Sequence, residues 1–125
     1  MRVGDVQTKT VLVERVHLVM YAGASGDFNP IHWNEVVAKA VGLPDVIAHG
    51  MYTQAQLAQL LGNPARIESF SVRFSAPLVV PAVGSTALDL TATVVAVDEH
   101  TATLELTATS QGVDIVKDAI AKVRL

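Results

Sequence analysis

The chain has 125 residues, enough for one domain with a substantial core, so we expect a single domain over residues 1–125. Half of the residues are hydrophobic, only 17% are charged and the net charge is −3, which argues against the basic surface that nucleic-acid binding requires. The absence of cysteine excludes disulfides and thiolate catalysis, and the lack of a long apolar run predicts a cytoplasmic protein without a membrane span.

The first part of the chain predicts one strand and two short helices. After a lead-in with a turn at Gly4-Asp5, residues 8–16 are rich in threonine and valine and predict a strand. Residues 17–24 have apolar side chains at helical spacing, with His17 as a surface or capping residue. Asn34 is a suitable N-cap for a second helix that ends at residue 41.

Residues 50–61 form the longest predicted helix, and Gly62-Asn63-Pro64 ends it. The segment has no charged residue, so we expect it to be buried inside a curved sheet. Its glutamines, at positions 54, 56 and 59, need polar partners, and we expect some of them to face solvent, a subunit interface or a ligand.

The remainder of the chain predicts antiparallel strands joined by short turns. The predicted strands are residues 67–74, 86–97, 101–109 and 114–125. This order, a strand, helices, one long helix and then strands, predicts an α+β fold in which a sheet wraps around a helix.

A carboxylate and an imidazole lie five positions apart within residues 21–33. Pro30 ends the preceding helix and Gly26 permits the chain to reverse, so a rigid loop should present Asp27 and His32 to a common point. Such a pair can move protons near neutral pH. On spacing alone, the simpler interpretation is a turn-capping Asp27 and a core His32.

Two stretches resemble the MaoC-like dehydratases, a family that includes the (R)-specific enoyl-CoA hydratases. The first is Tyr-Ala-Gly-Ala-Ser-Gly-Asp-Phe-Asn-Pro-Ile-His at residues 21–32, and the second is Ile-Ala-His-Gly-Met at residues 47–51, followed by the long helix. The resemblance extends from Val3 to Leu125 and is greatest to the catalytic subunit of a (3R)-hydroxyacyl-ACP dehydratase. It implies the hotdog fold.

The resemblance also implies a reaction, the reversible hydration of enoyl thioesters carried by CoA or acyl carrier protein. Asp27 and His32 would supply acid–base chemistry on a bound water, and the amide of Gly50 would stabilise the thioester oxygen. Three further residues fall in these blocks: Asn29 would orient the loop or the water, Ser25 would cap the helix end, and His49 would pack at the helix entrance or touch substrate. Which of Asp27 and His32 moves which proton stays open.

Two alternatives compete with the dehydratase prediction. A hotdog thioesterase would usually carry a carboxylate on or near the long helix, and residues 50–61 contain none. A non-catalytic partner subunit of a heteromeric dehydratase would be expected to lack the Asp and His that this chain keeps. We further expect a homodimer or heterodimer of hotdog subunits. No cofactor or metal is expected, since no His-x-x-x-His pair occurs.

Overall fold

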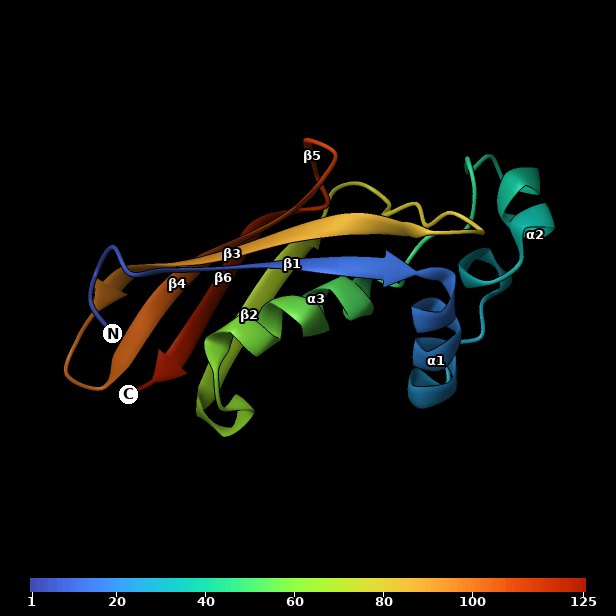
Figure 1. Cartoon of the computed structure of the whole chain (residues 1–125). Coiled ribbons are helices and arrows are strands. Elements are labelled where there is room, and N and C mark those ends of the chain that lie inside the picture. Colours follow the sequence, from blue (N-terminus) through green and yellow to red (C-terminus); the bar gives the residue numbers. More distant parts are fainter.

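The computed structural model describes all 125 residues as one antiparallel sheet with helices at one end and on one face (Figure 1). The strands lie in the order β1-β3-β4-β6-β2, and β5 pairs with β4. Their bounds are β1 Val6–Glu14, β2 Ile67–Phe74, β3 Ser85–Val97, β4 Thr101–Ser110, β5 Val113–Asp114 and β6 Val116–Arg124.

Three α-helices and three single-turn 3₁₀ helices complete the structure. The α-helices are α1 Arg15–Ser25, α2 Glu35–Ala40 and α3 Gly50–Ala58, and the 3₁₀ helices are η1 Pro30–His32, η2 Gln59–Leu61 and η3 Pro64–Arg66. In Figure 1, α3 runs along one face of the sheet, while α1 and α2 lie separately at one end of that sheet. None of these helices has the length and hydropathy needed to cross a membrane.

The core lies between α3 and the sheet. In β3 and β4, buried side chains alternate with more exposed ones, and the buried side chains are on the side that faces the helix. From α3, Tyr52, Thr53 and Leu57 are buried against them. The buried aliphatic residues of β3 and β4 are Leu88, Leu90, Ala92, Val94, Ala102, Leu104, Leu106 and Ala108. This arrangement confirms the predicted α+β hotdog fold.

The prediction that α3 is buried is right for one face only. Met51 is 57% exposed, and Ala55, one turn further along, is also exposed. Gln54 and Gln56 are half-buried, while the exposed Gln59 lies 3.5 Å from the ammonium of Lys9. The helix therefore presents an uncharged, uncovered side to solvent in the single chain.

Several predicted boundaries differ from those of the structure. The first strand ends at Glu14 rather than at residue 16, because the Glu14 amide donates to Nδ1 of His17 (2.9 Å) and a capping box starts α1 there. This confirms His17 as a capping residue. The predicted final strand is broken at Ile115, whose carbonyl accepts hydrogen bonds from the amides that follow β2. The long helix tightens into a 3₁₀ turn at residues 59–61.

Candidate active site

The loop after α1 holds the carboxylate of Asp27 in place. Gly26 adopts a left-handed conformation (φ 76°) and its amide donates to the carbonyl of Ala22, which ends the helix. The Asp27 amide then donates to the hydroxyl of Ser25 (3.2 Å), and the Asn29 amide donates to Oδ1 of Asp27 (3.1 Å). The loop thus occupies one carboxylate oxygen and leaves Oδ2 for other partners.

His32 ends the short helix η1 and is buried. Asn29 caps η1 by accepting a hydrogen bond from the Ile31 amide (3.3 Å), and Pro30 occupies the first helical position. The Nδ1 atom of His32 lies 2.7 Å from the carbonyl of Ile47. Because a carbonyl only accepts, Nδ1 carries the proton, and Nε2 of the neutral ring has a free lone pair.

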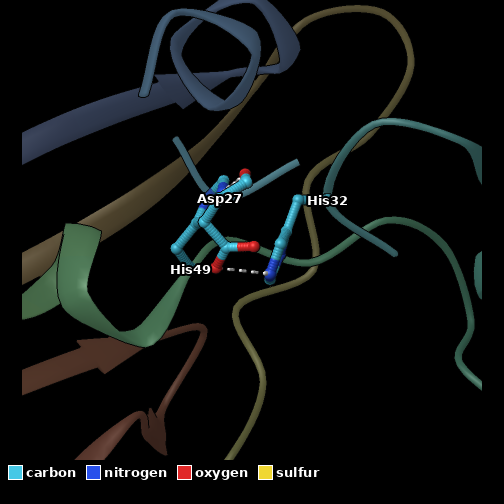
Figure 2. Close-up of side chains that lie close together, drawn as sticks. All are labelled: Asp27, His32 and His49. Carbon is cyan, nitrogen blue, oxygen red and sulfur yellow. Dashed lines mark hydrogen bonds and ion pairs between the residues drawn. The ribbon is translucent and has the colours of Figure 1, made fainter. Parts of the chain in front are cut away.

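Asp27 and His32 face each other across a short gap (Figure 2). The distance from Nε2 of His32 to Oδ2 of Asp27 is 3.9 Å, and the side chains are 9% and 53% exposed respectively. This separation is too long for a direct hydrogen bond. The structure therefore brings the predicted pair to a common point without joining the two groups.

The segment 46–48 ties this pair to the start of α3. The Ile47 amide donates to the carbonyl of Ile31 (3.1 Å), so Ile47 contacts the η1 loop through both of its backbone groups. On its other side, the segment exchanges hydrogen bonds with residues 78–80: Ala48 donates to Leu78 (2.9 Å) and Val80 donates to Val46 (3.0 Å). His32 is consequently fixed relative to Gly50, which lies two residues after the end of this segment.

Gly50 is the first residue of α3, and His49 is its N-cap. The amide of a first helical residue has no acceptor within its own helix, and no backbone or side-chain acceptor elsewhere in the chain takes it. A Cβ atom at Gly50 would lie 3.0 Å from the ring of Phe74, so glycine keeps the approach to this amide open. The positive end of the helix dipole adds to its capacity to bind an anionic oxygen.

His49 lies behind the pair and contacts both members. Its ring is stacked on that of His32, with centroids 3.7 Å apart and an interplanar angle of 20°. Its Nε2 lies 3.0 Å from the backbone carbonyl of Asp27, and only 3% of the residue is exposed. The structure therefore places five of the six predicted residues around one cavity, and the sixth, Asn29, caps η1 between Asp27 and His32. The five are Ser25, Asp27, His32, His49 and Gly50.

Two cavities meet at His32 and Gly50. One, of about 290 Å³, is the more polar of the two and contains Ser25, Asp27 and His49 among its lining residues. The other, of about 350 Å³, is mainly apolar and is lined in part by Phe74, Leu78 and Ile115. The imidazole and the free amide thus lie at the boundary between a polar and an apolar compartment.

Burial lowers the pKa of His32 below the ordinary histidine value of 6.5. The hydrogen bond to the Ile47 carbonyl opposes this effect, the neighbouring His49 adds to it, and the Asp27 carboxylate opposes it. Removal from water is the largest of these influences. His32 is therefore neutral at pH 7, with its Nε2 lone pair available.

The same three side chains bring potential metal ligands close together. One atom each from Asp27, His32 and His49 lies within 4.8 Å of the others. Two ring nitrogens already have carbonyl partners, Nδ1 of His32 and Nε2 of His49. This leaves the carboxylate, Nε2 of His32 and the buried Nδ1 of His49, which has no hydrogen-bond partner. The expectation that no metal is needed stays a prediction.

Sequence reasoning missed three contributors to the site. The Ile47 carbonyl fixes the tautomer of His32, Phe74 limits the space beside Gly50, and the buried Thr53 lines the apolar cavity. Ile47 lies in the second family block, but a backbone acceptor leaves no side-chain signal. Phe74 is brought close only by the pairing of β2 with β6.

The fold and the site together define a hotdog domain in which a carboxylate and an imidazole lie close together near the start of the central helix. The chain belongs to the family described as "MaoC like domain", which matches residues 3–114. The "3-hydroxyacyl-thioester dehydratase X" of Mycobacterium tuberculosis is 48% identical over 63 residues, or 50% of this chain. A solved "MaoC-like dehydratase" is 37% identical and superimposes on the whole chain with a TM-score of 0.94. The "(R)-hydratase from A. caviae involved in PHA biosynthesis" is 25% identical, with a TM-score of 0.90 over the whole chain.

These relatives differ in length from the chain. It spans 22% of the Mycobacterium tuberculosis dehydratase and 41% of the solved MaoC-like dehydratase, but 97% of the A. caviae hydratase. Two further structures share the fold at lower identity and are heteromeric: the ChsH1-ChsH2 complex (20%, TM-score 0.83, covering 98% of this chain and 95% of that one) and the HadBC complex (14%, TM-score 0.71, covering 98% and 96%), both from Mycobacterium tuberculosis.

The buried position of His32 predicts an acidic titration. Its ring should titrate below pH 6.5 in an NMR experiment, with the His32→Ala variant used to assign the signals. Because the unfolded chain binds this proton more readily, the contribution of neutral His32 to stability is present above pH 6.5 and is lost as the pH falls through the lower folded pKa. Asp27→Asn should lower the midpoint further, since the carboxylate raises the pKa of His32. A midpoint at or above 6.5 in the wild-type protein would contradict this assignment.

Proposed function

We propose that the chain catalyses the reversible hydration of trans-2-enoyl thioesters, which in reverse is the dehydration of (3R)-hydroxyacyl thioesters. One observation carries this proposal: Oδ2 of Asp27 and Nε2 of His32 are 3.9 Å apart beside the free amide of Gly50. Membership of the MaoC-like family and the similarity to the A. caviae hydratase support it.

The gap between Asp27 and His32 fits one water molecule. A water about 2.8 Å from each acceptor atom can donate one O–H to the carboxylate and the other to the imidazole. Its oxygen lone pairs are then left free to attack the β carbon of the enoyl group. Since Asp27 is charged and His32 is neutral in this state, both protons of the water have an acceptor.

The reaction then proceeds with no change of redox state. The water oxygen forms a bond to the β carbon, one of its O–H bonds breaks, and the pair retains that proton. The pair delivers a proton to the α carbon, so the product gains one OH and one H. Because Asp27 and His32 would share one water molecule, we assign the two transfers to the pair rather than to either residue.

The amide of Gly50 supplies the third element. As the β carbon is attacked, negative charge develops on the thioester oxygen, and a preorganised N–H at a helix N-terminus stabilises it. The apolar cavity beside Gly50, with Phe74 and Leu78 in its wall, suits the hydrocarbon part of an acyl group. Acyl-CoA and acyl carrier protein thioesters are both compatible with this arrangement.

The two alternatives receive less support. The segment 50–61 carries no Asp or Glu, so a thioesterase would lack the carboxylate usual on this helix. A non-catalytic subunit would not need Asp27 and His32 at water-bridging distance. We further propose that residues 1–125 act as one hotdog domain and that this domain is cytoplasmic, as its sequence predicts.

We infer that a second hotdog subunit, identical or different, packs beside the site. The strand β2 is last in the sheet order and so has an unpaired edge, and Phe74 at its end is 48% exposed. On the helical side, Met51 and Ala55 of α3 are uncovered. Apolar surface of this kind, continuous with a cavity, marks an interaction site.

Loss of either member of the pair should abolish most of the hydratase activity. Asp27→Asn and His32→Ala should each lower the turnover of crotonyl-CoA by about 10²–10⁴-fold while leaving the circular dichroism spectrum unchanged. His100→Ala, at an exposed hairpin tip, is the matched control and should turn over normally. Hydration is measured as loss of the enoyl absorbance, and a thiol-release assay is run in parallel to detect thioesterase activity. Wild-type turnover in both variants would end the proposal, and thiol release without hydration would favour the thioesterase.

The role of the Gly50 amide can be separated from the role of its missing side chain. Gly50→Ala adds a Cβ near Phe74 but keeps the N–H, whereas Gly50→Pro adds a ring and removes the N–H. Proline is tolerated at a first helical position, and the ψ angle of 135° at His49 suits a residue that precedes proline. We expect kcat of the proline variant to lie about 10²–10³-fold below that of the alanine variant. Equal kcat values would show that the amide is not used.

The presence of a second subunit can be tested by measuring the molecular mass in solution. Light scattering at high concentration should give twice the chain mass of 13.2 kDa if the chain forms a homodimer. Met51→Glu places a charge on the uncovered face of α3 and should shift the mass toward that of one chain, whereas Val83→Glu, at a 90% exposed position, should not. A mass of 13.2 kDa for the wild-type chain would rule out the homodimer and leave only the heteromeric form.

A further inference from the structure

His49 is a buried titratable residue that no step of the proposed reaction uses. Its Nε2 lies 3.0 Å from the backbone carbonyl of Asp27, its face is stacked on His32, and the ring of Tyr21 packs against it edge-on at a centroid distance of 4.8 Å. As the N-cap of α3, it is also bonded directly to Gly50. The side chain of His49 therefore connects Asp27 and His32 (Figure 2), while its backbone connects directly to Gly50.

Two separate requirements converge on this side chain. The stack on His32, with centroids 3.7 Å apart, requires a flat ring. The Asp27 carbonyl requires a donor, so Nε2 of His49 carries the hydrogen. Phenylalanine would satisfy only the first requirement and glutamine only the second, whereas a neutral imidazole satisfies both.

The other ring nitrogen shows that packing alone does not explain a histidine here. With the hydrogen on Nε2, Nδ1 of His49 is an acceptor, and it is buried with no hydrogen-bond partner. Leaving a buried acceptor unsatisfied opposes folding. A residue that only filled space would avoid this cost by being apolar, so the N–H of His49 has a use that offsets it.

We propose that His49 is a positioning residue that holds Asp27 and His32 at the spacing which one water molecule bridges. It acts through the Asp27 backbone and the His32 ring and does not contact the reacting atoms. The inference rests on the proposed hydratase function and deepens it. Displacing either acceptor by a fraction of an ångström would misplace the water relative to the β carbon.

Three substitutions separate the two requirements. His49→Phe keeps the ring and loses the donor, His49→Gln keeps a donor and loses the ring, and His49→Ala loses both. We expect kcat for crotonyl-CoA to fall about 10- to 100-fold in the phenylalanine and glutamine variants and further in the alanine variant, with KM nearly unchanged. His100→Phe makes the same chemical change at an exposed position and should leave kcat unaltered.

Stability and hydrogen exchange distinguish positioning from packing. His49→Phe should unfold at a urea concentration close to that of the wild type, because removal of the unsatisfied Nδ1 offsets loss of the hydrogen bond to the Asp27 carbonyl. The amides of Asp27 and Asn29, which bond within the loop, should exchange faster in this variant, while amides of β4 should not change. Reduced kcat together with retained stability supports the proposal. Wild-type kcat in His49→Phe would overturn it.

The exchange measurement also keeps the two proposals separable. If the wild-type protein has no hydratase activity, the proposed function fails, but faster exchange at Asp27 and Asn29 in His49→Phe still supports the link between His49 and the Asp27 loop. Unchanged exchange at these two amides would overturn that link whether or not the protein is active.

Discussion

The hydrogen bond from Nδ1 of His32 to the carbonyl of Ile47 is the interaction on which the rest of the site depends. It leaves the Nε2 lone pair facing Asp27, so that the imidazole is an acceptor there. With the opposite tautomer, Nε2 would donate toward the carboxylate, and the water would lose one of its two acceptors. Since the Ile47 amide is itself bonded to Ile31, the acceptor that sets the tautomer cannot move independently of the loop that carries the ring.

The distance between Asp27 and His32 and their unequal exposure both favour a water molecule held between them. The carboxylate of Asp27 is half exposed to solvent, whereas burial lowers the pKa of His32 and keeps its imidazole neutral. A direct hydrogen bond between them would have used a lone pair of one and a proton of the other. The gap of 3.9 Å keeps both lone pairs free, and the polar cavity that contains them gives water access to the gap. The pair is therefore better suited to hold a solvent molecule than to form an ion pair.

Sequence patterns predicted the parts of the site that depend on local backbone chemistry. Gly26 and Pro30 shape the loop through their own φ angles, and Gly50 marks a helix start, so these features could be read from residue type. The contributions of Ile47 and Phe74 could not, because one is a backbone acceptor and the other comes from a strand positioned by long-range pairing. The break at Ile115 was missed for a similar reason: its residue type favours a strand, and tertiary hydrogen bonds override that preference.

The uncovered side of α3 lies next to the site, where we propose that a second subunit packs. Phe74, which is half exposed at the end of the edge strand β2, forms part of the wall of the apolar cavity beside Gly50, so this wall is open to solvent. Electrostatic stabilisation by one amide is weak where water has access and grows as water is excluded. A second subunit over this face would therefore strengthen the interaction of the Gly50 amide with a developing oxyanion without contributing a catalytic group. On this argument, assembly and catalysis are linked through solvent exclusion, and the geometry of Asp27, His32 and His49 is complete within one chain.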